Sequence, residues 1–287
     1  MVKVIDGAKP WVFVYLTDED FGEAIDHALS NDHTYLRIDF AGLSADSADR
    51  LCSDARIHLL KYVHVVSAGK GIDCLKNFKG LQQISFAVPV EHFDFSCFPL
   101  LQQVGGVWTN GWCGLEKCQE LSRFRVSKFK GKFADIPNLA NLERIDLIQT
   151  TILSLSGLEQ AAKLKVLEIS HAGKLHSIQA IASVAATLER LVFDKCKNIE
   201  DVGVLRELGN VTELSLVDCG HISSVDFLEG MSRLHLFVAL GTKIVSGDLT
   251  PVLNNKTIRY VAVDNARDYR PKATAVEEAI RTRGIAS

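Results

Sequence analysis

The chain repeats one short pattern of apolar and polar positions along most of its length. Two copies, Leu188–Ile199 and Val211–Ile222, superpose after a shift of 23 residues. In both copies apolar residues occupy the first, fourth and sixth positions, a cysteine the ninth and an isoleucine the twelfth. Alternating apolar and polar residues predict a short strand with one buried face. Recurrence of this unit predicts a solenoid, because one turn buries its apolar face only by stacking on its neighbours.

The central apolar residue of each copy gives the period of the repeat. Ten such residues follow one another at steps of 20 to 24 positions: Val63, Ile84, Val104, Phe124, Ile145, Leu167, Leu191, Leu214, Phe237 and Val261. The pattern L-x-x-L-x-L at this spacing resembles the leucine-rich repeat, whose unit has about 20–29 residues. The resemblance implies an α/β solenoid. Its expected form is a curved stack with a parallel β-sheet on the concave face, short helices and turns on the convex face, and helical caps at both ends.

The two ends of the chain depart from the central pattern. Near the N-terminus, Val12–Val14 and Leu36–Ile38 have strand character, and a helical stripe of apolar residues follows each. We therefore expect helix-backed capping turns over residues 1–57, a solenoid body over 58–270 and a capping helix over 271–287. A separate small N-terminal domain is the alternative.

Helix signals are also present in the second half of the body and in the tail. Residues 180–186 and 202–208 are predicted to form short helices between strands. The tail helix is expected to begin at Thr274 and to run to about Arg283, with Gly284 as its C-cap.

The register of the strands decides which side chains point away from the core. With the ten central residues inward, the residues one before, one after and three after each of them face outward. The middle turns then present charged side chains, and the C-terminal turns present apolar ones. We expect this face to bind a protein partner, with arginine anchors and an apolar flank. The predicted contact residues are Arg123, Arg125, Arg144, Asp146, Glu168, Arg190, Asp194, Glu213, Leu236 and Tyr260.

Three other interpretations of these side chains stay open. The charged residues could form intramolecular ion pairs on a solvated face. If the arginines contact a partner instead, reversing their charge should weaken binding with little loss of folding stability. The apolar segment Leu234–Leu240 could be buried on both sides. Trp108 and Trp112, in a glycine-rich stretch, could anchor a partner or fill the interior. Cys196 and Cys219 are expected to fill interior positions, and the resemblance to the leucine-rich repeat implies that this position takes part in the hydrogen bonds where the strands end.

Composition narrows the function classes. The chain is 47% apolar and 23% charged with a net charge of −3, so it has no general positive field for nucleic acid or acidic lipid. The N-terminus lacks the apolar stretch of a secretory signal, and no run is long enough to span a membrane. Seven cysteines without a C-x-x-C pair favour free thiols in a reducing, cytoplasmic setting. No motif predicts a metal site, a cofactor or a catalytic centre.

These observations favour a non-catalytic protein-binding module. The family that these repeats resemble includes a nuclease inhibitor. We therefore expect a stand-alone inhibitor or neutraliser, such as an immunity-type protein that sequesters a cognate toxin or enzyme. An adaptor or substrate-recognition subunit of a larger complex is the first alternative. An enzyme with a site improvised from Arg125, Asp146 and Glu168 is the second.

Overall fold

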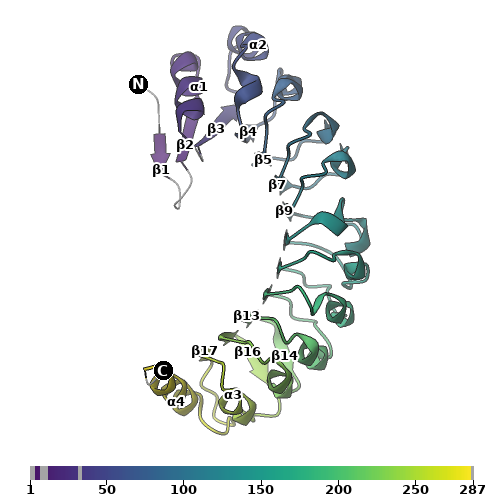
Figure 1. The fold of residues 1–287 in the computed structure, drawn as a ribbon, viewed down its shortest axis with the longest axis vertical. Coiled ribbons are helices and arrows are strands. Elements are labelled where there is room, and N and C mark those ends of the chain that lie inside the picture. Colours follow the sequence, from purple (N-terminus) through teal and green to yellow (C-terminus); the bar gives the residue numbers. More distant parts are fainter. Residues whose placement is uncertain (1–3, 7–11, 32–33, 286–287) are drawn as a thin grey trace. The chain divides into compact units, whose positions relative to one another are not determined.

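The computed structural model describes residues 4–6, 12–31 and 34–285 of the chain. The chain forms two compact units, Met1–Ser127 (unit 1) and Lys128–Ser287 (unit 2). In each unit a turn consists of a strand, an exit loop and a return segment, and successive turns stack through their strands (Figure 1).

The sheet of unit 1 is parallel except at its first strand. β1 pairs with β2 in antiparallel fashion, and every later pair is parallel. The strands are β1 (Val4–Asp6), β2 (Val12–Leu16), β3 (Thr34–Asp39), β4 (Tyr62–Ser67), β5 (Gln83–Phe86), β7 (Gln103–Val107) and β9 (Arg123–Ser127), with β6 (Phe93–Asp94) and β8 (Trp112–Cys113) forming a separate ladder. The helices are α1 (Phe21–Ser30) and α2 (Ala45–Ser53), and the 3-10 helices are η1 (Ile57–Leu59), η2 (Ile72–Asn77), η3 (Phe95–Cys97) and η4 (Leu115–Lys117).

The first turns of unit 1 are backed by α-helices, as the apolar stripes predicted. α1 packs against β2 and β3 and buries Phe21, Ala24 and Ile25. α2 begins where the Ser44 side chain accepts a hydrogen bond from the amide of Ser47, 3.2 Å away. The antiparallel strand β1 was not predicted.

The sheet of unit 2 is parallel throughout its described strands. These are β10 (Arg144–Ile148), β11 (Val166–Ser170), β12 (Arg190–Asp194), β13 (Glu213–Val217), β15 (Leu236–Ala239) and β17 (Tyr260–Val263), with β14 (Gly220–Ile222) and β16 (Thr242–Ile244) forming a second ladder. Within unit 2 the strands line the inside of the bend and the helical segments its outside (Figure 1).

The return segments of unit 2 are mostly 3-10 helices. They are η5 (Phe133–Asp135), η6 (Leu139–Asn141), η7 (Leu158–Gln160), η8 (Gln179–Val184), η9 (Val202–Glu207) and η10 (Asp226–Gly230), followed by the α-helices α3 (Thr250–Asn254) and α4 (Ala273–Ile285). The helices predicted at 180–186 and 202–208 are therefore present, but as 3-10 helices η8 and η9. The prediction of Gly284 as a C-cap is wrong, because α4 continues through this residue to Ile285.

The C-terminal helix closes the stack of unit 2. α4 packs against β17 and α3. The guanidinium group of Arg283 donates hydrogen bonds to the carbonyl oxygens of Asn255 and Leu253, each at 3.0 Å. These bonds join the last turn of α4 to the end of α3, where helical carbonyl groups otherwise lack partners.

The predicted register is confirmed. All ten central apolar residues are buried, none more than 7% exposed. In unit 2, Ile145, Leu167 and Leu191 are direct neighbours across three strands, and Leu214 and Phe237 continue the row. This row is the interior apolar column on which the stack depends.

Strand β9 of unit 1 and the strands β10 to β13 of unit 2 are each followed by a residue with left-handed backbone conformation. At these exits φ lies between 50° and 61°, and the residues are Lys128, Gln149, His171, Lys195 and Asp218. The amide of each donates to a carbonyl oxygen of the following turn, at 2.8 to 2.9 Å. The left-handed residue turns the chain out of the strand while its amide stays hydrogen-bonded.

The cysteines of the repeat contribute to the same exits. The thiol of Cys196 donates to the carbonyl oxygen of Ile169 at 3.5 Å, and that of Cys219 donates to the carbonyl oxygen of Phe193 at 3.4 Å. Burial raises the pKa of Cys196 to about 11 and that of Cys219 to about 12. Both are therefore interior thiols with a structural role, as predicted. All seven cysteines, each within the described residues, are free thiols.

Candidate functional site

Five of the six charged residues predicted on the outward face of unit 2 join into one ion-pair network. The side chain of Arg144 binds Asp146 through Nε and Glu168 through Nη2, each at 3.0 Å. Arg190 binds the same Glu168 through Nε at 3.0 Å and Glu213 through Nη1. The network crosses β10 to β13 and combines two positive with three negative groups. Its arginines are thus engaged within the chain, as the ion-pair interpretation predicted.

Burial makes part of this network structural. The carboxylate of Asp146 is buried, although the register places it on the outward face. Burial lowers the pKa of Arg144, but hydrogen bonds and charge attraction from Asp146 and Glu168 outweigh it, so the pKa of Arg144 is raised. Asp194, also predicted to contact a partner, is half-buried and forms no ion pair with any described residue.

An apolar flank follows the network on the same face. Leu236 pairs with Tyr260 across β15 and β17, and both side chains point outward. Tyr260 is 56% exposed and Leu240 is 41% exposed, while Leu236 is half-buried. The alternative that residues 234–240 are buried on both sides is therefore wrong. The packing of α4 leaves these outward positions accessible.

The outward face of unit 1 holds a cluster that the sequence analysis did not single out. Six side chains from three neighbouring strands form it, and we call it the aromatic patch: Phe13 and Tyr15 from β2, Tyr35 and Arg37 from β3, and Tyr62 and His64 from β4. The rings of Phe13 and Tyr35 stack with centroids 5.4 Å apart, and those of Tyr35 and Tyr62 are 5.6 Å apart. Tyr35 is buried, whereas the other five are half-buried.

Arg37 lies at the centre of the aromatic patch. Its guanidinium carbon is 4.7 Å from the ring centre of Tyr15 and 5.4 Å from that of Phe13, which is cation–π geometry. Its Nε atom is buried and has no hydrogen-bond acceptor among the described residues. The patch therefore presents a positive charge framed by aromatic rings, together with an unsatisfied donor.

Two titratable groups of the aromatic patch are shifted by burial. Desolvation raises the pKa of Tyr35 to about 12, and its hydroxyl donates a short hydrogen bond to Oε1 of Gln83. Desolvation, aided by the charge of Arg37, lowers the pKa of His64 to about 4. His64 is therefore neutral at pH 7, with Nδ1 2.7 Å from the hydroxyl of Ser85.

The two predicted arginines of unit 1 lie on β9 and are exposed. The nearby tryptophans belong mainly to the interior. Trp112 is buried, and its Nε1 donates to the carbonyl oxygen of Val90 at 3.2 Å. Trp108 is half-buried and packs edge-on against Trp112 and Phe124. The interior interpretation is confirmed for Trp112.

Comparison with solved structures identifies the fold. An internalin (InlF) from Listeria monocytogenes matches 85% of this chain and 70% of its own, with 15% identity and a TM-score of 0.58. The leucine-rich repeat domain of the type III effector XopL matches 77% of this chain and 81% of its own, with 15% identity and a TM-score of 0.50. Mouse RP105, solved in complex with MD-1, matches 80% of this chain and 47% of its own, with 14% identity and a TM-score of 0.51.

The chain has a leucine-rich-repeat fold. No protein-family model matches the sequence, and no curated protein is significantly similar to it. At these identities the comparisons establish the fold of the chain and not its function.

The described part of this chain holds no cluster of three or more histidine, cysteine or acidic residues placed to bind a metal ion. Its described helices are all too short or too polar to cross a bilayer. Asp146 and Glu168 are the two carboxylates of the improvised acid–base site suggested by the sequence. Glu168 binds two arginines, and Asp146 is buried against Arg144. Both carboxylates are thus tied to structural ion pairs.

Proposed function

We propose that this chain is a protein-binding module that holds its partner against the outward strand faces. The aromatic patch of unit 1 is the observation that carries the proposal. Tyrosine and arginine are the residue types that most often dominate binding energy at protein interfaces. Here they gather on one rigid sheet, half-exposed, with a buried guanidinium donor that lacks an acceptor among the described residues. A partner carboxylate placed there would be attracted to the guanidinium charge of Arg37.

The outward face of unit 2 supports the same proposal in a different way. Its apolar flank supplies exposed contact area at Tyr260 and Leu240. The neighbouring ion-pair network keeps Arg190 and Glu213 in fixed positions at the surface. A partner that binds here meets fixed charges beside an apolar patch, so binding costs little side-chain entropy. The ten residues predicted from the register stay proposed contacts under this view.

Site-specific photo-crosslinking tests which face meets the partner. A benzoylphenylalanine at Tyr62 or Tyr260 should crosslink to the same protein in extracts of the native source. The same probe at Glu207 or Lys256, exposed on the return side, should give no such product. Crosslinks only from the return side would contradict the proposal, as would the absence of any strand-face product.

Affinity measurements with the crosslinked partner, once purified, then test the contacts. Tyr62→Ser and Tyr260→Ser should each weaken binding about tenfold or more, because loss of an interface tyrosine removes contact area that a serine cannot replace. Leu59→Ser is the matched control, since Leu59 is 55% exposed but lies in η1, away from the strand face. Equal affinities for all three variants would refute the assignment.

We further propose that binding neutralises the partner, which would be a toxin or an enzyme. A rigid face several strands wide can cover a functional surface of another protein. The free thiols support a reducing, cytoplasmic setting for this encounter. A stoichiometric excess of the chain should abolish the activity of the purified partner. Full activity in the saturated complex would favour an adaptor role instead.

We also keep the three-part division of the chain as a proposal, with capping turns over 1–57, a body over 58–270 and a capping helix over 271–287. The helix backing of β2 and β3 supports the first part, and the packing of α4 against β17 supports the last.

A further inference from the structure

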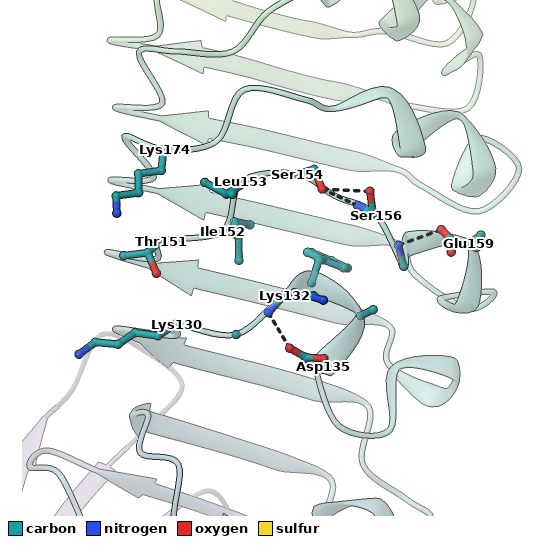
Figure 2. A pocket seen from close by; sticks show the side chains of 14 residues that line it. Lys130, Lys132, Asp135, Thr151, Ile152, Leu153, Ser154, Ser156, Glu159 and Lys174 are labelled. Carbon is teal, nitrogen blue, oxygen red and sulfur yellow. Dashed lines mark hydrogen bonds between the residues drawn. The ribbon is translucent and has the colours of Figure 1, made fainter.

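A groove lies on the strand-exit flank of unit 2, on a different surface from the outward strand face (Figure 2). Its volume is about 880 Å³. Two consecutive return segments, residues 130–135 and 151–159, form most of it, and Lys174 of the next turn closes one end. Figure 2 shows Lys130, Thr151 and Lys174 along its outer rim, on three successive exit loops.

The groove arises because two neighbouring turns have different return paths. After β9 the chain enters η5 at Phe133, soon after the exit loop. After β10 the corresponding stretch is extended, and Ser154 forms an isolated bridge with Ser177 of the following turn. A helical turn and an extended segment cannot pack flush against each other. Phe133 and Ile152 are buried beneath the groove, and Leu153 is 56% exposed within it.

The charges in the groove are unbalanced. Three exposed lysines line it, Lys130, Lys132 and Lys174, and none forms an ion pair with any described residue. The two acidic residues are held by backbone amides. Asp135 accepts a hydrogen bond from the amide of Lys132 at 2.7 Å, and Glu159 accepts one from the amide of Gly157 at 3.0 Å. With three lysines and two carboxylates, the lining of the groove has a net charge of +1, in a chain whose net charge is −3.

We infer that this groove binds an acidic, extended segment of a protein partner, with an apolar side chain of that segment resting on Leu153. Lys130 and Lys174 are two strand spacings apart, roughly 10 Å between backbones. Alternate side chains of an extended peptide point to one side, about 7 Å apart. An acid–x–apolar–x–acid segment would therefore place its apolar residue over Leu153 and its carboxylates within reach of the two flexible lysines.

The geometry favours such a peptide over nucleic acid. The groove itself spans only three exit loops and holds three lysines, whereas nucleic-acid binding uses a long basic stripe along the phosphate backbone. The exposed leucine between the lysines adds an apolar contact that a polyphosphate cannot use. This inference goes beyond the proposed function because it assigns a second surface, on the flank, with its own ligand chemistry.

A fluorescein-labelled peptide, Gly-Asp-Ser-Leu-Ser-Glu-Gly, tests the inference by fluorescence polarisation and amide chemical shifts. It should bind saturably and shift the amides of residues 130–132, 151–156 and 174. The amide counterpart, Gly-Asn-Ser-Leu-Ser-Gln-Gly, should bind about tenfold more weakly or worse, because it lacks the charges that the lysines attract. A peptide with serine in place of leucine should also bind more weakly.

Variants of the full chain locate the site. Lys130→Glu with Lys174→Glu should weaken peptide binding about tenfold or more. Lys197→Glu with Lys256→Glu is the matched control, because both lysines are exposed, belong to unit 2 and lie outside the groove. All four lysines are exposed, so circular dichroism should show both variants folded.

Several outcomes would overturn the inference. These are no saturable binding at millimolar peptide, equal weakening in the two charge variants, or shifts confined to the strand face. Inorganic pyrophosphate that binds as well as the peptide, with no effect of the leucine, would show a simple anion site. Tyr62→Ser and Tyr260→Ser should leave peptide binding unchanged, which separates failure at the groove from failure of the proposed strand-face function.

Discussion

Arg144 tests whether the charged network of unit 2 is structural. The Arg144→Met variant keeps most of the apolar stem of the side chain and removes the charge that links Asp146 to Glu168. As an outward residue of a predicted binding face, Arg144 is expected from the sequence to contribute little to folding stability. The structure changes that expectation, because the carboxylate of Asp146 would lose the cation beside it while remaining buried.

The magnitude follows from burial. The side chain of Asp146 is 7% exposed, that of Glu168 is 28% exposed and that of Arg144 is 37% exposed. Fully exposed ion pairs contribute about 0.2–1 kcal/mol, and removing one partner of a buried pair costs about 3–5 kcal/mol. Because solvent screens Arg144 over more than a third of its surface, we expect a loss of about 1–2 kcal/mol, which lowers the urea midpoint by roughly 0.5–1 M.

Urea unfolding followed by far-ultraviolet circular dichroism measures this loss. All three tryptophans of the sequence, Trp11, Trp108 and Trp112, belong to unit 1, so their fluorescence would not report on unit 2. Lys165→Met is the control, since it removes an exposed ion pair with Glu143. The side chain of Lys165 is 49% exposed and that of Glu143 is 48% exposed. This variant should cost less than about 0.5 kcal/mol. Equal midpoints for the two variants would refute the structural role of Arg144.

Two further predictions concern the interior and the aromatic patch. Leu191→Ala should lower the free energy of unfolding by about 2–5 kcal/mol, since Leu191 is fully buried. Val192→Ala, at a half-buried outward position, should lower it by less than about 1.5 kcal/mol in the same urea titration. Similar losses in the two variants would mean that the register is wrong. The pKa of His64 is lowered to about 4, so the unfolded chain takes up its proton first and stability falls as pH decreases from about 6.5 to 4. His64→Gln should reduce that slope by up to about 1.4 kcal/mol per pH unit, and an unchanged slope would contradict the burial of the imidazole.

The inward positions could be predicted because one physical constraint fixes them. Each turn has only a few apolar residues, and alternation leaves a single way to bury Leu191 and Phe193 together. Once that choice is made, Arg190 and Glu213 must face outward, as they do. The same logic placed two cysteines inside, where their thiols meet backbone carbonyl oxygens.

The sequence contains enough information to predict the aromatic patch, although the pattern of central residues alone does not reveal it. The ten regularly spaced central residues begin only at Val63, and the strands before them differ in the helices that follow. Extending the same register to β2 and β3 aligns Phe13 with Tyr35 and Tyr15 with Arg37. These residues continue the outward rows that Tyr62 and His64 begin.

Ion pairing and the groove could not be predicted from spacing. Arg144 lies beside Val166 in the register, yet its guanidinium reaches diagonally to Glu168. That choice depends on side-chain rotamers, which the repeat pattern does not encode. The groove depends on a mismatch between the return path after β9, which enters η5, and the extended path after β10, and the repeat pattern specifies neither path. Gly284 does not end α4, since glycine stops a helix only where the chain turns away from it.

The strands β11, β12 and β13 each end at a left-handed exit residue, and each is hydrogen-bonded to a different neighbouring turn at its entry and at its exit. At the exit of β12 the amide of Lys195 donates to the carbonyl oxygen of Val217, in the turn that follows. At its entry the amide of Arg190 donates to the carbonyl oxygen of Lys165, in the turn that precedes. Hydrogen exchange at these two amides therefore senses opposite neighbours. A turn lost on the C-terminal side frees the exit amide first, and one lost on the N-terminal side frees the entry amide, so a single strand can record the direction in which the stack unravels.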